Sequence, residues 1–460
     1  MNSNEFLSLD LRSLAAVYNS GKLTPANVIE LVYERIEKYA DPAVWTCLIP
    51  PAESLERAEN LMAQNAKNLP LYGVPFAIKD NIDLANVPTT AGCPAFAYIP
   101  ERSATVVEKL CAAGAIPIGK TNMDQFATGL VGTRTPYKTC RNPFDSRYIP
   151  GGSSSGSGVA VSAGLVSFAL GTDTAGSGRV PAAFTNIVGL KPTKGLLSTR
   201  GVVPAVRSLD CVSIFALTCR DAEAILQVAA GFDVEDAFSR LAPVTNLPEN
   251  KNLRVGIPGE SYLNFFGNLE AEKRYREAID RLQKLGNQIV EIDFKAFAET
   301  APLLYDGPWV AERLAAVGEF LMQNKDAVDP IVYEIISGGS RFDAVTTFKS
   351  FYHLAELKRQ AEIQWQSMDV LALPTTGTIY SVEEVQKEPF LLNRNLGLYT
   401  NFVNLLDLAA IALPSGFQNN KLPTGITLMA PAWNDAFLCR LGAILHAELG
   451  GKLGATNVLL

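Results

Sequence analysis

Histidine is nearly absent from this chain of 460 residues, which contains only His353 and His446. Both lie in helix-like segments far from any glycine-rich loop, so a structural role is favoured for each, and a histidine-based catalytic site has few candidates. The sequence also lacks clusters of metal ligands at usable spacings, which makes a zinc site improbable. We expect no metal centre.

Long apolar runs and paired cysteines are missing as well. No stretch of about twenty apolar residues is present, so a membrane span is not expected. The amino terminus has no basic start followed by an apolar stretch, so no secretory signal is visible. The seven cysteines are scattered and show no CxxC spacing. Such a pattern is typical of free thiols in a reducing cytosol, and we expect a cytoplasmic protein.

The sequence also lacks an excess of basic residues. Lys and Arg number 40 against 47 Asp and Glu, a net charge of −7. This balance argues against general binding of nucleic acid or anionic membrane, although it leaves room for a local basic patch. With 48% hydrophobic and 19% charged residues the composition is that of a globular protein.

Strand-like and helix-like segments alternate along the chain. Thr24 and Pro25 begin a helix, residues 71–82 form an apolar strand, and residues 103–122 form a helix followed by a buried strand. Further strands are expected within 253–258 and 288–294, with a charged helix between them, and residues 235–252 are expected to be a surface connection. This alternation predicts one large α/β domain with a mixed sheet and helical excursions.

The glycine- and serine-rich stretch 149–164 has three ordinary explanations: a linker, a phosphate-binding loop or a catalytic loop. Closely flanking apolar segments disfavour a linker, and no lysine follows the glycines as a phosphate loop requires. Just downstream, GTDTAGSGRVP places Ser177 among small residues. Their backbone N–H groups can converge on one point, as a developing oxyanion needs.

A serine hydroxyl needs a base to become a nucleophile. With histidine so scarce, the remaining base near neutral pH is a lysine whose pKa falls by roughly three from its usual value of about 10.4. Lys79 ends the apolar segment VPFAIKDN, where burial could lower its pKa. Taken alone, Lys79 could equally be a salt-bridge or surface residue.

The segments VPFAIKDN, PGGSSSGS and GTDTAGSGRVPAAF, in this order, resemble the amidase signature family. Ser153 and Ser177 lie 24 positions apart (177 − 153), as the bridging serine and the nucleophile do in that family. The resemblance covers residues 70–220 and continues more weakly to the end. It implies the amidase signature fold, a large mixed β-sheet surrounded by α-helices, in one domain over residues 1–460.

The resemblance also implies roles. Ser177 attacks the amide carbonyl, while Ser153, which follows a cis peptide bond in the family, relays the proton to neutral Lys79. The oxyanion would be held by backbone N–H groups of Thr174, Ala175, Gly176 and Ser177. Three further residues support the site: Asp173 and Arg179 as a buried pair, and Ser154, which either bonds Lys79 or completes the loop. Ser155 stands where many members have glycine, and this departure leaves the triad intact.

Residues 126–137, 198–218 and 303–313 resemble the allophanate hydrolases of this family. The implied reaction is hydrolysis of the terminal amide of allophanate, a small anion, without metal or organic cofactor. Tyr305 and Arg313 match substrate-binding residues and, eight positions apart on a presumed helix, would share a face. The alternatives are simple packing for Tyr305 and a surface salt bridge for Arg313. Gly129 and Gly132 would let the backbone approach the ligand, or are turn glycines.

Two other functions are open at this point: an amidase of broader specificity, and an ammonia-producing subunit of a glutamyl-tRNA amidotransferase. A catalytically inactive binding protein is disfavoured by the intact set of Lys79, Ser153 and Ser177. The resemblance further implies a homodimer, a functional link to urea carboxylase or to s-triazine degradation, and the absence of the additional C-terminal domain of full-length allophanate hydrolases. The pathway that supplies the substrate stays open.

Overall fold

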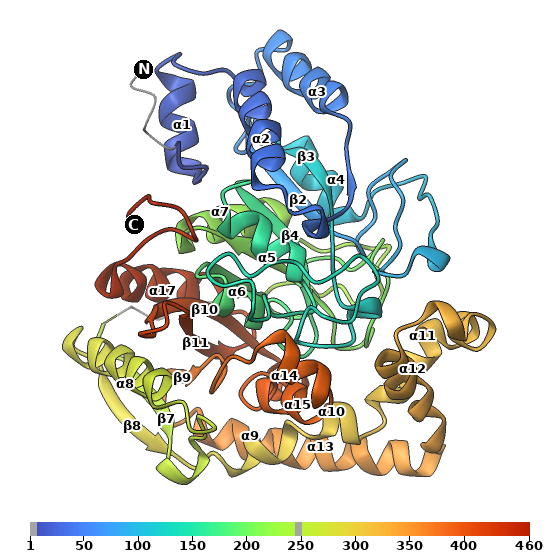
Figure 1. Cartoon of the computed structure of the whole chain (residues 1–460). Coiled ribbons are helices and arrows are strands. Elements are labelled where there is room, and N and C mark those ends of the chain that lie inside the picture. The colour runs from blue at the N-terminus through green and yellow to red at the C-terminus, as the bar shows by residue number, and fades with distance from the viewer. Residues whose placement is uncertain (1–6, 244–250) are drawn as a thin grey trace.

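Strands from both halves of the chain join in one twisted, mixed sheet (Figure 1). The computed structural model describes residues 7–243 and 251–460. Within these ranges eleven strands pair in the order β1-β3-β2-β4-β6-β5-β10-β11-β9-β7-β8. Their bounds are Trp45–Leu48, Pro75–Lys79, Ile116–Thr121, Phe168–Asp173, Val188–Lys191, Cys211–Ala216, Arg254–Pro258, Gln288–Ile292, Val370–Pro374, Leu408–Phe417 and Pro423–Pro431 for β1 to β11.

The strands at the centre of the sheet are buried along their whole length. Every residue of β2, β3, β4, β5 and β6 is buried, as expected for apolar strands covered on both faces. The helices α1 to α8 and α17 span Leu11–Asn19, Pro25–Tyr39, Pro51–Ala63, Thr105–Ala112, Ser155–Ser162, Val180–Phe184, Cys219–Ala229, Leu269–Lys284 and Asp435–Leu449. Helices α5 and α6 pack against β4 and β10, whereas α7 and α17 pack against each other and against β6 and β10.

Several predicted elements are confirmed. Thr24 caps α2 through its side chain, with Pro25 in the first turn. The strand and helix expected within 103–122 are α4 and β3, and the charged helix is α8 between β7 and β8. The surface connection predicted for 235–252 lies partly outside the described residues. No helix in the described ranges combines the length and apolarity needed to cross a bilayer.

A long helical excursion separates β8 from β9 and occupies the lower and right-hand parts of Figure 1. It comprises α9 to α13, at Lys295–Thr300, Leu303–Asp306, Trp309–Gln323, Pro330–Ser337 and Ala344–Gln364. Short helices α14, α15 and α16 follow β9, at Val382–Lys387, Leu391–Leu396 and Phe402–Leu405. Helix α11 packs through Phe320 against Phe96 and Phe126, which lie in the loops that follow β2 and β3.

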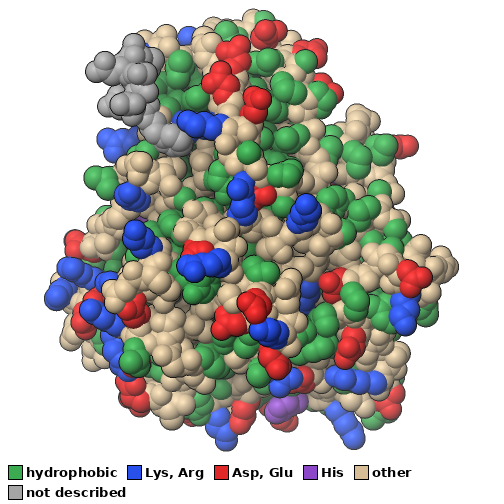
Figure 2. Space-filling model, viewed as in Figure 1, with side chains coloured by type: hydrophobic (Ala, Val, Ile, Leu, Met, Phe, Trp, Pro, Cys, Tyr) green, Lys and Arg blue, Asp and Glu red, His purple; other side chains and the backbone are tan. Residues whose placement is uncertain are grey.

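Charged side chains of both signs are interspersed over the face shown in Figure 2, without a broad area of one sign. This distribution agrees with the modest negative net charge of the sequence. It gives no support on this face to an extended basic surface for nucleic acid.

Candidate active site

The parallel neighbours β2 and β4 end at the same edge of the sheet, and their last residues begin the candidate site. Lys79 ends β2 and is fully buried. Its Nζ donates to Ser153 Oγ at 2.8 Å and to Thr172 Oγ1 at 2.7 Å. Burial lowers the pKa of Lys79 from 10.5 to about 7, against the opposing effect of the Asp124 and Asp173 charges. The amine therefore exchanges its proton near neutral pH.

Ser153 follows a cis peptide bond from Gly152, and α5 begins two residues later. Its carbonyl oxygen accepts from the backbone N–H of Asp124 at 3.0 Å. Ser154 donates its hydroxyl to the carbonyl of Thr172 at 3.2 Å. Of the two alternatives for Ser154, the structure therefore has the one in which it completes the loop.

Ser177 lies in the turn after β4 and is 2% exposed. Its Oγ is 3.5 Å from the carbonyl oxygen of Gly129, the one acceptor it reaches among the described residues. Gly176, directly before it, has φ +131° and sits against Thr400, whose Oγ1 would clash with an added Cβ. Only glycine fits this turn, for both reasons.

Asp173 and Arg179 form the buried ion pair that orients this turn. Arg179 donates Nε and Nη2 to the two carboxylate oxygens, each at 2.8 Å. Burial alone would raise the pKa of Asp173, but the Arg179 guanidinium outweighs it, and the pKa lies below its usual value. The same carboxylate accepts from the backbone of Gly176 and Gly178 at 2.9 and 3.0 Å.

The N–H of Gly176 is thus already engaged. Among the described residues, the backbone N–H groups of Thr174, Ala175 and Ser177 donate to no other group. Three of the four expected oxyanion donors are therefore available to a ligand.

Two buried carboxylates that the sequence analysis did not single out hold the neighbouring loops. Asp124 accepts from the backbone of Val131, Gly132 and Arg134 at 3.2, 3.0 and 2.9 Å. Gly132 has φ +75°, and an added Cβ there would be 2.7 Å from a backbone oxygen. Asp124 was detectable as a polar residue just after the buried strand β3, although nothing local says what it binds.

Asp210 performs the corresponding task for the nucleophile turn. It accepts from the hydroxyl of Thr174 and from the backbone of Ala205 and Val206 at 2.8 and 3.1 Å. Burial raises the pKa of the Asp210 carboxyl, and these hydrogen bonds act in the opposite direction. Asp210 follows Thr174 by 36 positions in the sequence, so spacing alone does not reveal that the two side chains are hydrogen-bonded.

Tyr305 and Arg313 come together, but not as the sequence predicted. They do not share one helix: Tyr305 is in α10, which ends at Asp306, and Arg313 is in α11, which begins at Trp309. Gly307 and Pro308 separate the two, because proline lacks the N–H that a continuous helix would use and glycine disfavours helix. The Arg313 guanidinium nevertheless lies 5.4 Å from the centroid of the Tyr305 ring.

Arg313 is 1% exposed and its guanidinium is only partly satisfied. Nη1 donates to Thr128 Oγ1 at 3.0 Å, whereas Nε and Nη2 find no partner among the described residues, nor does the hydroxyl of Tyr305. The adjacent Glu312 instead accepts from the backbone N–H and hydroxyl of Ser208. The surface salt bridge considered for Arg313 is therefore not formed among the described residues.

A model of the amidase family matches residues 27–439. The chain belongs to the amidase family. The urea amidolyase of Lachancea kluyveri is 46% identical over 92% of this chain, and the chain spans 23% of that protein. A glutamyl-tRNA(Gln) amidotransferase component of Symbiobacterium thermophilum is 34% identical over 94% of this chain and 95% of its own length.

Solved structures agree with this assignment. The allophanate hydrolase of Kluyveromyces lactis is 44% identical, with a TM-score of 0.90 over 96% of this chain and 72% of that one. The urea amidolyase of K. lactis is 43% identical and matches with a TM-score of 0.93 over 99% of this chain and 28% of that one. The chain thus spans about a quarter of the urea amidolyases that it matches, and the predicted fold, a large mixed sheet surrounded by helices, is confirmed.

The histidines of this amidase lie away from the site. His446 is buried in α17, and burial lowers its pKa to about 4. His353 is exposed on α13 beside Glu356. Both have the structural settings that the sequence favoured. In the described part of the chain, no group of three or more His, Cys, Asp or Glu side chains is arranged to hold a metal ion.

Proposed function

We propose that the chain hydrolyses the terminal amide of allophanate and releases ammonia. The observation that carries this proposal is the buried Arg313, whose Nε and Nη2 have no partner in the described part of the chain and which lies beside the Tyr305 hydroxyl, likewise without a described partner. A buried cation with unused donors costs several kcal/mol unless an anion or acceptor meets it. The site therefore favours a ligand that carries an anionic group.

A carboxylate fits these donors because the Nε and Nη2 edge of a guanidinium can donate two parallel hydrogen bonds to its two oxygens. Arg313 Nη1 is bound to Thr128, and the next residue, Gly129, supplies the carbonyl nearest Ser177 Oγ. The anion site and the nucleophile are thus connected through one short loop. A small amide with a carboxylate at its other end, as in allophanate, suits such an arrangement.

In the proposed reaction, Ser177 Oγ turns from the Gly129 carbonyl towards Ser153 and bonds to the amide carbon while its proton passes to Ser153 Oγ, whose own proton passes to neutral Lys79. The free N–H groups of the nucleophile turn stabilise the oxyanion. The carbon–nitrogen bond then breaks, and the proton returned through Ser153 leaves with the nitrogen as ammonia. Water next attacks the acyl-enzyme and releases N-carboxycarbamate and the Ser177 hydroxyl, and N-carboxycarbamate decomposes to ammonia and carbon dioxide.

The relatives named urea amidolyase and allophanate hydrolase support this substrate. A second candidate, the ammonia-producing component of a glutamyl-tRNA amidotransferase, is favoured by the nearly full-length match to such a protein at 34% identity. The two functions differ in the amide cleaved. The first needs no partner, whereas the second predicts glutaminase activity that depends on other proteins of the complex.

Ammonia release from four amides separates the candidates. Allophanate and malonamate each join a primary amide to a carboxylate, biuret lacks the carboxylate, and glutamine represents the amidotransferase. We expect kcat/KM to be highest for allophanate, intermediate for malonamate and low for biuret and glutamine. A preference for biuret or glutamine would contradict the proposal, and equal rates on all four would indicate an amidase of broader specificity.

The cellular setting is also proposed. All seven cysteines are free, which fits a reducing compartment, so we propose the cytoplasm. Allophanate is urea bearing a carboxylate, so carboxylation of urea would form it, which supports the functional link to urea carboxylase. We further propose a homodimer. The exposed Phe348 and Tyr352 of α13 offer a surface for a second copy, and sedimentation would test this.

A further inference from the structure

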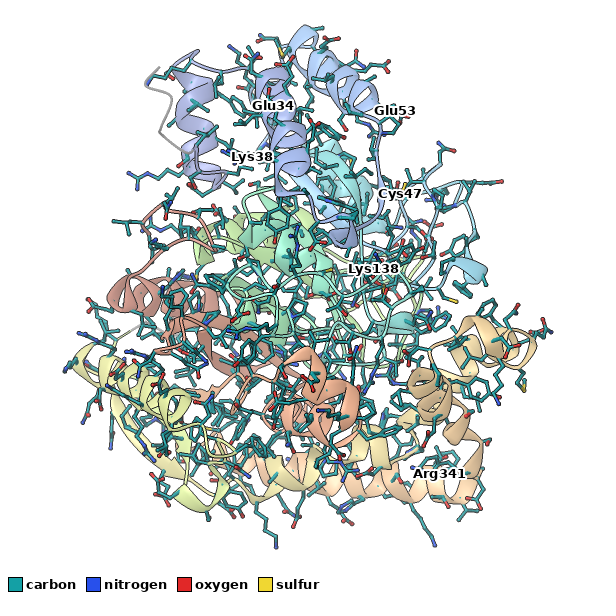
Figure 3. The ribbon with its side chains drawn as sticks, in the orientation of Figure 1. Glu34, Lys38, Cys47, Glu53, Lys138 and Arg341 are labelled. Carbon is teal, nitrogen blue, oxygen red and sulfur yellow. The ribbon has the colours of Figure 1, made fainter. Side chains whose placement is uncertain are left out.

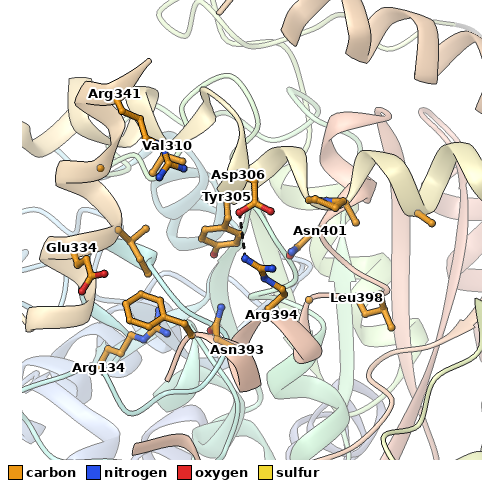
Figure 4. A pocket seen from close by; sticks show the side chains of 17 residues that line it. Arg134, Tyr305, Asp306, Val310, Glu334, Arg341, Asn393, Arg394, Leu398 and Asn401 are labelled. Carbon is orange, nitrogen blue, oxygen red and sulfur yellow. Dashed lines mark hydrogen bonds and ion pairs between the residues drawn. The ribbon is translucent and has the colours of Figure 1, made fainter. Parts of the chain in front are cut away.

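A cavity of about 470 Å³ lies on the outer side of Tyr305 (Figure 4). It is bounded by α10, α12 and α15, together with the turn that follows α12 at Gly338–Arg341. Its volume is several times that of a single small amide. None of the three proposed catalytic side chains lines it.

The catalytic pocket itself is closed to solvent in this structure. Lys79 and Ser153 are 0% exposed, Ser177 is 2% exposed and Arg313 is 1% exposed. Tyr305 lines the cavity and also lies against the Arg313 guanidinium, 5.4 Å from its ring centroid. This side chain is therefore the wall between the open cavity and the buried anion site.

The lining of the cavity lacks the negative excess of the whole chain, which carries −7. Its exposed charged residues are two arginines, Arg341 and Arg394, and two acids, Asp306 and Glu334, whereas a third arginine, Arg134, is buried. Arg394 reaches across the opening to Asp306, the neighbour of Tyr305, at 3.4 Å, as the dashed line in Figure 4 marks. Arg341 is exposed and forms no ion pair with a described residue, and Figure 3 places it on the outer part of the helical excursion.

We propose that this cavity is the vestibule through which the anionic substrate reaches the site, with Arg341 and Arg394 attracting it and Tyr305 moving aside to admit it. The inference rests on the proposed function, because only a charged substrate would be steered. Attraction by exposed cations acts over about 10 Å at 0.1 M salt and over about 30 Å at 0.01 M. The two arginines should thus contribute to the encounter and not to the chemical step.

The charge test compares Arg341→Gln, Arg394→Gln and the double variant with the wild type. We expect kcat/KM for malonamate to fall about threefold or more per substitution at low salt, with kcat unchanged, and the dependence on salt to weaken in the double variant. Cleavage of neutral biuret should not change. Arg359→Gln, an exposed change on α13, is the matched control for lost charge. An unchanged salt dependence in the double variant would overturn the steering.

The steric test uses Gly338, which lines the cavity with φ −59° and has no atom of a described residue within 4 Å of an added Cβ. Gly338→Phe should fold normally and project a ring into the vestibule, lowering kcat/KM for charged and neutral amides alike by about tenfold. Gly338→Ala, which adds no bulk beyond Cβ, should retain wild-type rates.

Full activity in a Gly338→Phe protein with an unchanged melting temperature would show that substrate enters elsewhere. This result differs from failure of the proposed function. That function fails if the wild type prefers uncharged amides, whereas the Gly338→Phe test can be run with whichever amide is cleaved.

Discussion

The ionisation of Lys79 should set the lower limb of the pH–rate profile. Burial lowers the pKa of this amine from 10.5 to about 7. At pH 8 a pKa of about 7 leaves about nine-tenths of the amine neutral, whereas the ordinary pKa would leave roughly 0.3% neutral, a difference of about 300-fold. Because the neutral amine is the base, kcat/KM should rise as the pH rises through about 7 and then level off.

The assay is ammonia release from malonamate between pH 5.5 and 9, a range in which the substrate carboxylate stays ionised. The perturbation is Lys79→Arg, which keeps a cation but replaces the base with a guanidinium that stays protonated. We expect kcat to fall by about three orders of magnitude or more, and the limb near pH 7 to disappear. The hydrogen bonds to Ser153 and Thr172 show that the position itself tolerates a donor.

A second buried group could imitate this behaviour. Burial and the neighbouring Asp10 raise the pKa of Asp221, in α7, to about 7. Asp221→Asn is therefore the control, and it should leave the kinetic midpoint in place because Asp221 contacts the backbone of Leu11 and not the site. A wild-type midpoint near 10, a midpoint that moves in Asp221→Asn, or more than about one percent activity in Lys79→Arg would refute the role of Lys79.

Three other outcomes are expected. Ser177→Ala should abolish ammonia release, and activity above about one percent would exclude Ser177 as nucleophile. Arg313→Ala should raise KM for malonamate far more than for biuret. Tyr305→Phe should have the same effect more weakly, with a loss of about 1 kcal/mol of binding free energy for malonamate. Unchanged KM values would place the carboxylate elsewhere. Folding raises the pKa of Asp221, so its contribution to the free energy of unfolding falls as the pH rises from about 4 to 7. The free energy of unfolding in urea should therefore be higher for Asp221→Asn than for the wild type above pH 7, by up to about 4 kcal/mol. Near pH 4 the two proteins should be equally stable.

The sequence by itself determined the features that depend on neighbouring residues. The cap of α2 at Thr24, the apolar strand that ends at Lys79 and the small-residue turn around Ser177 are local patterns, and each was predicted. The near absence of histidine directed attention to lysine as the base. These features follow from backbone preferences and burial within a few residues, which a single segment already contains.

Only the tertiary structure decided how distant residues meet. Asp124, Asp210 and Thr172 hold the catalytic loops through hydrogen bonds that span up to 93 positions, and their importance is not visible in any one segment. The break at Gly307–Pro308 was readable as a helix terminator. The resemblance placed Tyr305 and Arg313 together, but it did not say how they meet across that break. That contact depends on α11 packing through Phe320 against the loops that follow β2 and β3, because contacts between distant segments are selected by the burial of the whole chain.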